Sequence, residues 1–273
     1  MIKLGVHPNF QKKYPPVLAI GGHDPSGGAG IIADAQTLLA LGAWPLTLIT
    51  CLTAQNTQFI KQVSYQPIEA FQQQLETLLA DFQPAAIKLG VLGDMAIQET
   101  LANLLKRNTQ IPVILDPVMA STSGTAFSNA ALLAHLKEYI IPFCTVITPN
   151  LPELEQLVPG ESSIAAKAEQ LLKLGCKAVL VTGTHSQTHT VKNLLFSASD
   201  NEPTVNRWQR LEGEFHGSGC TLASALAALL GRGEDLATAS VKAQDYTWRS
   251  LEKALKLTEG QLLPLRLQDT NHA

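Results

Sequence analysis

Short apolar runs alternate with amphipathic segments along most of the chain, and this alternation limits the fold more than any other feature of the sequence. The apolar runs predict strands over residues 16–22, 45–54, 85–92, 111–119, 145–150 and 177–183. The amphipathic segments predict helices over residues 27–42, 67–82, 95–107, 128–140, 151–158 and 163–174. Strands that are apolar at nearly every position and are separated by helices are typical of a parallel sheet with helices on both faces. We therefore expect an α/β fold.

The end of the chain departs from this alternation. Two further strands are predicted near 189–196 and 204–210, and no helix is predicted between them. Strands that follow each other so closely pair in antiparallel fashion, so we expect an antiparallel edge of the sheet here. Two helices near 218–231 and 234–256 complete the pattern.

Length and charge narrow the choice of partners. A chain of 273 residues, 45% of them hydrophobic, can bury the core of a single domain. We expect that domain to span residues 1–273, with a core at about 15–256 and loose ends. The net charge is −3 and the basic residues are scattered, which does not favour nucleic acid or an anionic membrane as a partner. No stretch approaches the ~20 apolar residues that span a bilayer. The expected partners are small molecules.

The first 16 residues contain no apolar run of the length of a signal peptide. The sequence has four cysteines, far apart and without a C-x-x-C pair: Cys51, Cys144, Cys176 and Cys220. This spacing indicates neither a zinc site nor a disulfide framework. We expect a cytoplasmic protein.

The first candidate site is the segment "GGHDPSGGAGIIAD", residues 21–34, which directly follows the first predicted strand. In a parallel sheet, ligands bind at the carboxyl ends of the strands. Residues 28–33 formally match the dinucleotide fingerprint G-x-G-x-x-A, but the acidic residue expected roughly 20 positions further on is missing. The Walker A pattern also fails, because its Lys and Ser or Thr are missing. The segment is either a substrate wall with Asp34 directed at the ligand, or a tight turn with Asp34 on a solvent-facing helix surface.

Two further candidates also follow strands. Asp116 ends the apolar run 111–115, where it can bind a cation or a hydrogen-bond donor, or simply form an Asp-Pro turn. Asn150 and Glu153 lie three residues apart at the start of a predicted helix. This spacing suits a hydrated Mg²⁺, which takes one or two protein ligands and several waters. A helix cap predicts the same residues.

The segment "EFHGSGCTLASALAALL", residues 214–230, places a glycine turn directly before a long apolar helix. The N-terminus of a helix attracts anions through its unpaired N–H groups and its dipole. Cys220 lies in this turn, and the setting predicts a thiol with a lowered pKa. The thiol is either a base or a small residue that packs beneath the first helical turn.

Taken together, these segments carry a family resemblance. The motifs occur in the order "DPSGGAGIIAD", "LTAQNT", "IKLG", "LDPVM", "ITPNLPE" and "HGSGCTLASA", from about residue 16 to 250. In this order and spacing they resemble the hydroxymethylpyrimidine and hydroxymethylpyrimidine-phosphate kinases of thiamine biosynthesis, which have the ribokinase-like fold. The resemblance implies a three-layer α/β/α sandwich and two ATP-dependent phosphorylations, of 4-amino-5-hydroxymethyl-2-methylpyrimidine and then of its monophosphate. It also implies Mg²⁺, a homodimer and, as an open option, a monovalent cation.

The resemblance assigns roles to particular residues. The anion hole would be formed by Gly217, Ser218, Gly219 and Cys220, and Cys220 is the candidate base. The aminopyrimidine would be held by Gly22, Asp34 and Gln55. ATP would be bound by Asn150, Thr182 and Gly183, and the metal would be organised by Glu153 and Asp116.

The sequence departs from the common family pattern at two positions. Thr122 and Thr182 stand where many relatives have lysines that could touch phosphates, which leaves the efficiency of the second phosphorylation open. A pyridoxal kinase is the closest alternative, and Gln55 argues against it because its amide suits an aminopyrimidine edge. A non-catalytic pyrimidine-binding protein is a second alternative. Retention of Asn150, Glu153 and Cys220 together argues against that interpretation.

Overall fold

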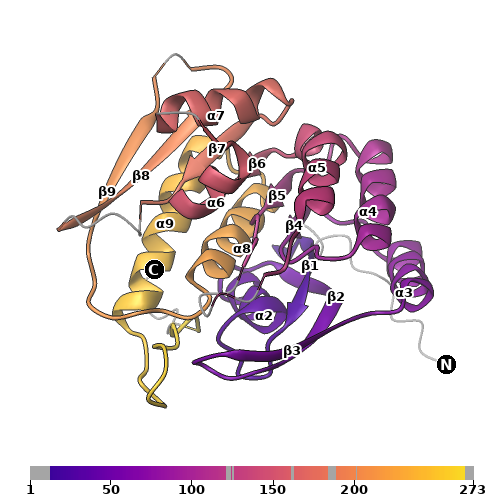
Figure 1. Cartoon of the computed structure of the whole chain (residues 1–273), viewed down its shortest axis with the longest axis horizontal. Helices are drawn as coiled ribbons and strands as arrows, with labels where there is room; N and C mark the ends of the chain where they lie inside the picture. The colour runs from indigo at the N-terminus through magenta and orange to yellow at the C-terminus, as the bar shows by residue number, and fades with distance from the viewer. Residues whose placement is uncertain are drawn as a thin grey trace.

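The computed structural model describes residues 13–120, 124, 126–160, 163–183, 189–200 and 202–267. Its strands form one nine-stranded sheet in the order β3-β2-β1-β4-β5-β6-β7-β8-β9 (Figure 1). The strands are β1 (Pro16–His23), β2 (Trp44–Gln55), β3 (Ile60–Tyr65), β4 (Ala86–Leu89), β5 (Val113–Leu115), β6 (Val146–Ile147), β7 (Ala178–Val181), β8 (Thr190–Ser197) and β9 (Thr204–Gln209).

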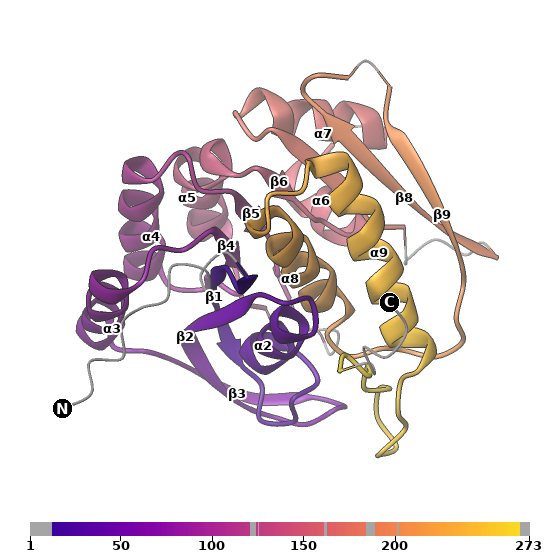
Figure 2. The same cartoon turned by 180° about the vertical axis from the view of Figure 1, so that it is seen from behind.

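Helices cover both faces of this sheet. One face carries α3 (Ile68–Asp81), α4 (Met95–Arg107), α5 (Ala130–Tyr139), α6 (Leu151–Leu157) and α7 (Ile164–Lys173), with the short 3₁₀ helix η1 (Ile141–Phe143) after α5. The other face carries α2 (Gly30–Ala40), α8 (Ser218–Gly231) and α9 (Leu236–Glu252), which Figure 2 shows in front. The predicted three-layer α/β/α architecture is confirmed.

The strand pairing confirms the mostly parallel sheet. Strands β2, β1, β4, β5, β6 and β7 pair in parallel, each with its neighbour. Strands β7, β8 and β9 pair in antiparallel fashion, so the predicted antiparallel edge is also confirmed. A second antiparallel edge, formed by β3 against β2, was not predicted from the sequence. Its residues, "IKQVSY", are mostly polar and have no buried face, so they lack the apolar signal of a strand.

The alternation of side chains along β1 explains how the sheet holds the two helical layers. Leu18 and Ile20 point into the core that contains α3 to α7, whereas Val17 and Ala19 point into the core that contains α2, α8 and α9. All four side chains are fully buried. Because burying one such large aliphatic side chain contributes roughly 1.5–3 kcal/mol, strands that are apolar on both faces stabilise both layers at once.

Helix α8 lies closest to the centre of the sheet. Residues 221–230 are all buried, and many are alanine, which allows the helix to pack closely across β1, β4 and β5. At Gly231, an added Cβ would lie 3.1 Å from Cγ2 of Val17. This packing brings the N-terminus of α8 to the carboxyl ends of the central strands.

The C-terminal segment packs against the rest of the fold. The predicted loose end after residue 257 is therefore wrong for the described residues, which reach residue 267. Leu262 accepts a hydrogen bond from the backbone N–H of His216 at 2.9 Å and donates one to Glu214 at 2.8 Å. Arg266 is 2% exposed. The predicted loose N-terminus lies almost wholly outside the described residues. None of the helices in the described part of the chain is long and apolar enough to cross a membrane.

Candidate active site

A cavity of about 750 Å³ lies where the central strands end. The cavity is lined by most of the residues that the sequence singles out: Gly22, Gln55, Asp116, Asn150, Glu153, Thr182, Gly217, Ser218, Gly219 and Cys220. Asp34 and Gly183 are not among the lining residues. Thr122 lies outside the described residues. The topology therefore gathers motifs from five different strand ends and one helix start into a single space.

The turn at residues 216–220, here called the α8 turn, forms one wall. Gly217 is the N-cap of α8 and has a left-handed backbone, with φ of 73°. An added Cβ at Gly217 would lie 2.1 Å from the carbonyl oxygen of Gly28, so only glycine fits. The first N–H groups of α8 begin here, as the predicted anion site requires.

The α8 turn packs against residues 24–30, here called the first glycine loop. Asp24 organises this loop by accepting hydrogen bonds from the backbone N–H groups of Ser26 and Ala29, both at 2.8 Å. Its carboxylate also lies 2.8 Å from Nε2 of His216. Burial alone would raise the pKa of Asp24, but hydrogen bonds from His216 and Ser26 outweigh it and lower the pKa. Asp24 was not among the predicted site residues, although Asp before Pro-Ser is a recognisable turn signal.

Asp34 lies behind the cavity wall and is fully buried. Its carboxylate accepts hydrogen bonds from Nζ of Lys88 at 2.9 Å and from the hydroxyl of Ser224 at 2.8 Å. Neither predicted alternative is therefore correct, since Asp34 faces neither solvent nor the open cavity. Lys88 and Ser224 were missed, although a lysine inside the apolar run "AIKLG" signals a buried ion pair.

Lys88 does line the cavity, and it is the buried positive charge among several acids. Burial alone would lower its pKa, but the charges of Asp34, Cys220 and Asp116 raise the pKa above its usual value. The ammonium group is therefore charged at neutral pH. It balances part of the negative charge at this end of the cavity.

The pKa predicted for Cys220 is wrong. The residue is partly exposed toward the cavity, yet burial of the thiol raises its pKa to about 12. Lys88 opposes this rise, whereas the carboxylates of Asp34 and Asp116 add to it. The helix N-terminus is thus outweighed by desolvation and by two neighbouring acids.

Asp116 and Glu153 bring two more carboxylates to the cavity. Burial and the charge of Asp34 raise the pKa of Asp116, against the opposing effects of Lys88 and of a hydrogen bond from Cys220. Burial and the charge of Asp116 raise the pKa of Glu153. Lys88 compensates the charge of Asp116 only in part, and no cation is among the groups that shift the pKa of Glu153, so a divalent metal would relieve both carboxylates.

Asn150 and Glu153 also form a complete capping box at the start of α6, so the cap interpretation of these residues is correct. The Asn150 side chain accepts from the N–H of Glu153, and the Glu153 carboxylate accepts from the N–H of Asn150, both at 2.9 Å. Within the described part of the chain, no three His, Cys, Asp or Glu side chains gather into a metal site. A metal here would rely on water and ligand oxygens as well as protein carboxylates.

The other end of the cavity lies near β7, β8 and α9. Thr182 pairs with Asn150 in an isolated bridge, and it lines the cavity. The backbone N–H of Gly183 donates to Oδ1 of Asn193 at 3.0 Å. Gln244 in turn accepts from Nδ2 of Asn193, also at 3.0 Å. Gly183 thus supports this end of the site from behind.

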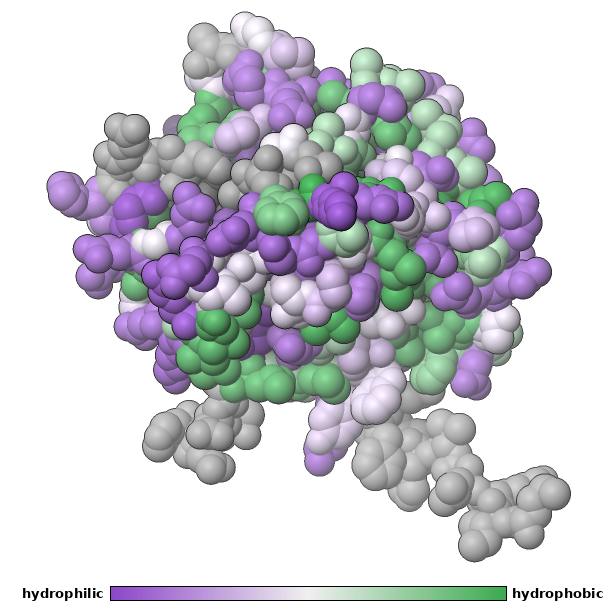
Figure 3. Space-filling view, turned by 60° about the horizontal axis from the view of Figure 1, so that its bottom comes forward, coloured by the Kyte–Doolittle hydropathy of each residue, from purple (hydrophilic) through white to green (hydrophobic). Residues whose placement is uncertain are grey.

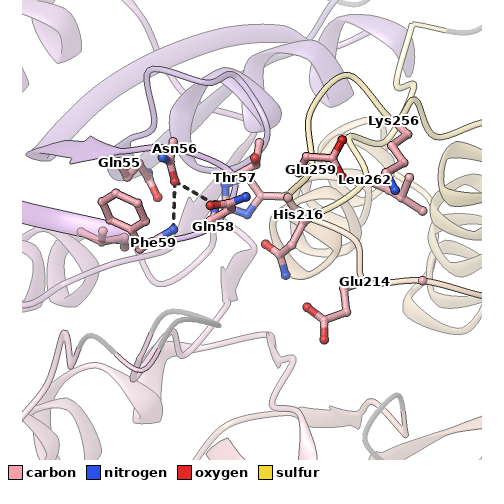
Figure 4. A pocket seen from close by; sticks show the side chains of 14 residues that line it. Gln55, Asn56, Thr57, Gln58, Phe59, Glu214, His216, Lys256, Glu259 and Leu262 are labelled. Atoms are coloured by element: carbon pink, nitrogen blue, oxygen red, sulfur yellow. Dashed lines mark hydrogen bonds between the residues drawn. The ribbon is translucent and has the colours of Figure 1, made fainter.

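A second cavity, of about 550 Å³, adjoins the first (Figure 4). It lies between the turn that joins β2 to β3 and the C-terminal segment near residues 256–262. Gln55 and His216 line both cavities and stand at their boundary. In the turn, Asn56 accepts hydrogen bonds from the backbone N–H groups of Gln58 and Phe59, at 2.9 and 3.0 Å. This turn therefore holds Gln55 at the end of β2.

Known proteins are similar to this chain in both sequence and fold. Residues 24–264 match the family model of phosphomethylpyrimidine kinase. A hydroxymethylpyrimidine/phosphomethylpyrimidine kinase of Haemophilus influenzae is 34% identical over 251 residues, which cover 89% of this chain and 93% of that protein.

Solved structures agree with these sequence matches. A phosphomethylpyrimidine kinase from Clostridium difficile superposes with a TM-score of 0.74 at 31% identity, covering 86% of this chain and 99% of that one. A pyridoxal kinase from Staphylococcus aureus in complex with pyridoxal superposes with a TM-score of 0.84 at 26% identity, covering 93% and 94%. The same Staphylococcus enzyme has also been solved with AMP-PCP and with ADP.

Proposed function

We propose that this chain, which belongs to the phosphomethylpyrimidine kinase family, phosphorylates 4-amino-5-hydroxymethyl-2-methylpyrimidine and then its monophosphate, with ATP as the phosphoryl donor. The chain is a phosphotransferase of thiamine biosynthesis, as its relatives are. The main support for the detailed proposal is a single cavity, which is lined by Gln55, by the α8 turn and by the carboxylates of Asp116 and Glu153.

Gln55 and the backbone of Gly22 form the end of the cavity that we assign to the aminopyrimidine. The Gln55 amide offers one donor and one acceptor group, which match the amino group and a ring nitrogen of the pyrimidine. The wall at Gly22 is tight, since an added Cβ would lie 3.0 Å from Sγ of Cys51. A flat ring fits beside such a backbone surface.

The α8 turn would bind the phosphoryl group in transfer. Gly217, Ser218 and Gly219 present the start of α8 to the cavity, where N–H groups stabilise negative charge. Phosphoryl transfer depends mainly on positioning and on charge neutralisation, and this wall supplies both. Asp116 lies beside it, since a Cβ at Gly219 would approach Oδ1 of Asp116 to 3.4 Å.

Glu153 and Asp116 would hold Mg²⁺ together with water, and Asn150, Thr182 and Gly183 would position the nucleotide. The fit rests on the two carboxylates, whose pKa values are raised by burial and which Lys88 compensates only in part. When bound, Mg²⁺ would neutralise charge on the triphosphate. A monovalent cation could share this task, in place of the lysines replaced by Thr122 and Thr182.

Cys220 is the residue that we propose lies against the hydroxymethyl oxygen of the substrate. Because its pKa is about 12, the thiol is protonated in the free protein at neutral pH. The base role therefore requires bound cations to lower that pKa, with Lys88 as the cation already present. Otherwise the alcohol proton passes to the phosphate, and the thiol serves as a polar wall.

Pyridoxal phosphorylation is the second candidate activity, because the pyridoxal kinase structure superposes with a TM-score of 0.84. The test is to incubate the protein with ATP, Mg²⁺ and either the hydroxymethylpyrimidine or pyridoxal, and to follow products by ³¹P NMR. We expect the pyrimidine monophosphate and then the diphosphate. Phosphorylation of pyridoxal alone would establish the second candidate, and no turnover of either would indicate a binding protein.

Three properties of the whole protein complete the proposal. One domain over the whole chain is supported by the single sheet. A cytoplasmic location is supported by the four free cysteines. A homodimer is what the family resemblance implies, and Trp44 at the start of β2 and Phe59 in the turn after it, 53% and 51% exposed, offer apolar surface to a partner. Light scattering of the purified protein measures the oligomeric state directly.

A further inference from the structure

The C-terminal segment returns to the active site after α9. In both cartoon views it forms a loop below α9 and comes back toward the start of α8 (Figures 1 and 2). Leu262 pairs with Phe215, directly before the α8 turn, and Leu263 pairs with Leu255. These pairings carry Arg266 to the junction of the α8 turn and the first glycine loop.

The guanidinium group of Arg266 is inserted into this junction. The side chain is 2% exposed, and it donates hydrogen bonds to neutral oxygens: Thr221 Oγ1 at 2.8 Å, Gln36 Oε1 at 3.2 Å, and the carbonyl oxygens of Gly27 at 3.3 Å, His216 at 3.4 Å and Gly28. These acceptors come from three different segments. Arg266 therefore connects the first glycine loop, helix α2 and the start of α8 in one planar fork.

The contact with the two glycine segments is close. An added Cβ at Gly217 would lie 2.9 Å from Nη2 of Arg266 and 2.1 Å from the carbonyl oxygen of Gly28. Nη2 donates to that same carbonyl and to the carbonyl of His216, on the two sides of this approach. Without the guanidinium, the buried carbonyl of Gly28 and the partly buried carbonyl of His216 would lose this donor, and the two segments would lose the bridge between them.

The charge of Arg266 matters as well as its geometry. None of the acceptors bonded to it is a carboxylate, so no acid cancels its charge through a direct hydrogen bond. Burial lowers the pKa of Arg266, against the opposing charges of Cys220, Tyr246, Asp34 and Asp24, so its charge is felt at the α8 turn and at both acids. A buried positive charge behind a helix N-terminus strengthens the attraction of that terminus for an anion.

We propose that Arg266 is a positioning residue for phosphoryl transfer, which holds the α8 turn against the first glycine loop and adds buried positive charge behind the anion hole. This inference rests on the proposed function. It assigns to the C-terminal segment a direct part in building the active site. The role is one of placement, because Arg266 does not line the main cavity.

The test compares Arg266→Met and Arg266→Lys with Arg232→Met. Arg232 is a matched control, since its Nη1 donates to the carbonyls of Leu41 and Gly42 at 3.2 and 3.5 Å, at the other end of α2, and it is exposed. We expect Arg266→Met to lower kcat about 100-fold, as a small misplacement of the reacting groups does, with KM for both substrates changed only a few-fold. Arg232→Met should leave both constants unchanged.

Arg266→Lys keeps the charge and the aliphatic stem but loses the fork, so it serves where the methionine variant does not fold. We expect it to fold and to lower kcat about tenfold. Added guanidinium at low millimolar concentration should restore part of kcat in Arg266→Ala and should leave kcat of Arg232→Ala unchanged. A wild-type kcat in both Arg266→Lys and Arg266→Met would assign Arg266 to stability alone. So would a fall in melting temperature with an unchanged kcat and no effect of added guanidinium. An inactive wild-type protein would instead overturn the proposed function.

Discussion

Cys220 shows how strongly one residue depends on neighbours that the sequence does not reveal. Its place at the start of α8 can be predicted from the sequence, and the structure has it there. The two acids that raise its pKa, Asp34 and Asp116, come from segments about a hundred or more positions away. Local helix electrostatics, worth about 0.3–1 kcal/mol, are therefore outweighed by desolvation and by two buried carboxylates.

The raised pKa of Cys220 makes a prediction about its reactivity. Only the thiolate reacts with iodoacetamide, so a thiol with a pKa of about 12 should be alkylated far more slowly than a free cysteine at pH about 7.5. The rate should rise with pH up to the limit of protein stability. Mass spectrometry of digested protein measures it, with Cys220→Ala as the control for the other cysteines, which are buried. Rapid labelling at neutral pH would contradict the raised pKa.

Gln55 makes a prediction about substrate affinity. Replacing it by alanine leaves one polar edge of the pyrimidine without its partner, which costs about 1–3 kcal/mol. Gln55→Ala should therefore raise KM for the hydroxymethylpyrimidine roughly 10- to 100-fold, with KM for ATP unchanged. Gln62→Ala is the matched control, since Gln62 lies on the exposed strand β3 and bonds only to Ser64 at 3.2 Å. Equal kinetics in the two variants would remove Gln55 from the substrate site.

At the scale of the element, α6 begins with residues that serve both as a cap and as a candidate metal site. The capping box predicts that Glu153→Gln keeps its acceptor for the N–H of Asn150, so the melting temperature should change little. Loss of the charge should depress kcat at fixed Mg²⁺, and added Mg²⁺ should recover part of it.

The cap role has its own control. Asn129 caps α5 by accepting from the N–H of Leu132 at 3.0 Å, away from the cavity. Asn129→Ala should lower stability by about 1 kcal/mol without any dependence of kcat on Mg²⁺. If kcat of Glu153→Gln is as independent of Mg²⁺ as that of Asn129→Ala, Glu153 is only a cap.

The first glycine loop makes a prediction about pH. The pKa of Asp24 is lower in the folded chain than its ordinary value of 3.8, because hydrogen bonds from His216 and Ser26 outweigh burial. Its carboxylate therefore contributes stability that is fully present above about pH 4 and is lost as pH falls through the lower folded pKa. The gap in melting temperature between the wild type and Asp24→Asn should shrink as pH falls from about 6 to about 3. A gap that stays constant over this range would contradict the assignment.

The elements themselves could be predicted because their signals are local. The run 16–22 became β1, and the turn before α8 is where the glycines indicated. What could not be predicted depends on long-range contacts. Strand β3 is stabilised by pairing with β2, not by its own polar residues, and the segment after α9 is held in place by Arg266. Asp34 was expected either to face the ligand or to face solvent, and its ion pair with Lys88 could not be predicted because Lys88 lies 54 positions further on.

At the scale of the whole molecule, the parallel order of the sheet accounts for the site. Every motif but the α8 turn follows a parallel strand, and the strands β2, β1, β4, β5, β6 and β7 have their carboxyl ends on the same side of the sheet. The spatial order of the strands could not be derived from their sequence order, so the sequence predicted the members of the site better than their contacts.

On the surface that includes the bottom of Figure 1, hydrophobic side chains form separate groups among hydrophilic ones (Figure 3).

The cavity that joins Gln55 and the α8 turn is proposed to be specific for an aminopyrimidine alcohol. The most direct measurement is the ratio of kcat/KM for the hydroxymethylpyrimidine to kcat/KM for pyridoxal, at saturating ATP and Mg²⁺ in the wild-type protein. Because pyridoxal lacks the amino group that Gln55 would bind, we expect a ratio of at least about ten in favour of the pyrimidine. A ratio of one or below would contradict it, and would assign the cavity to pyridoxal.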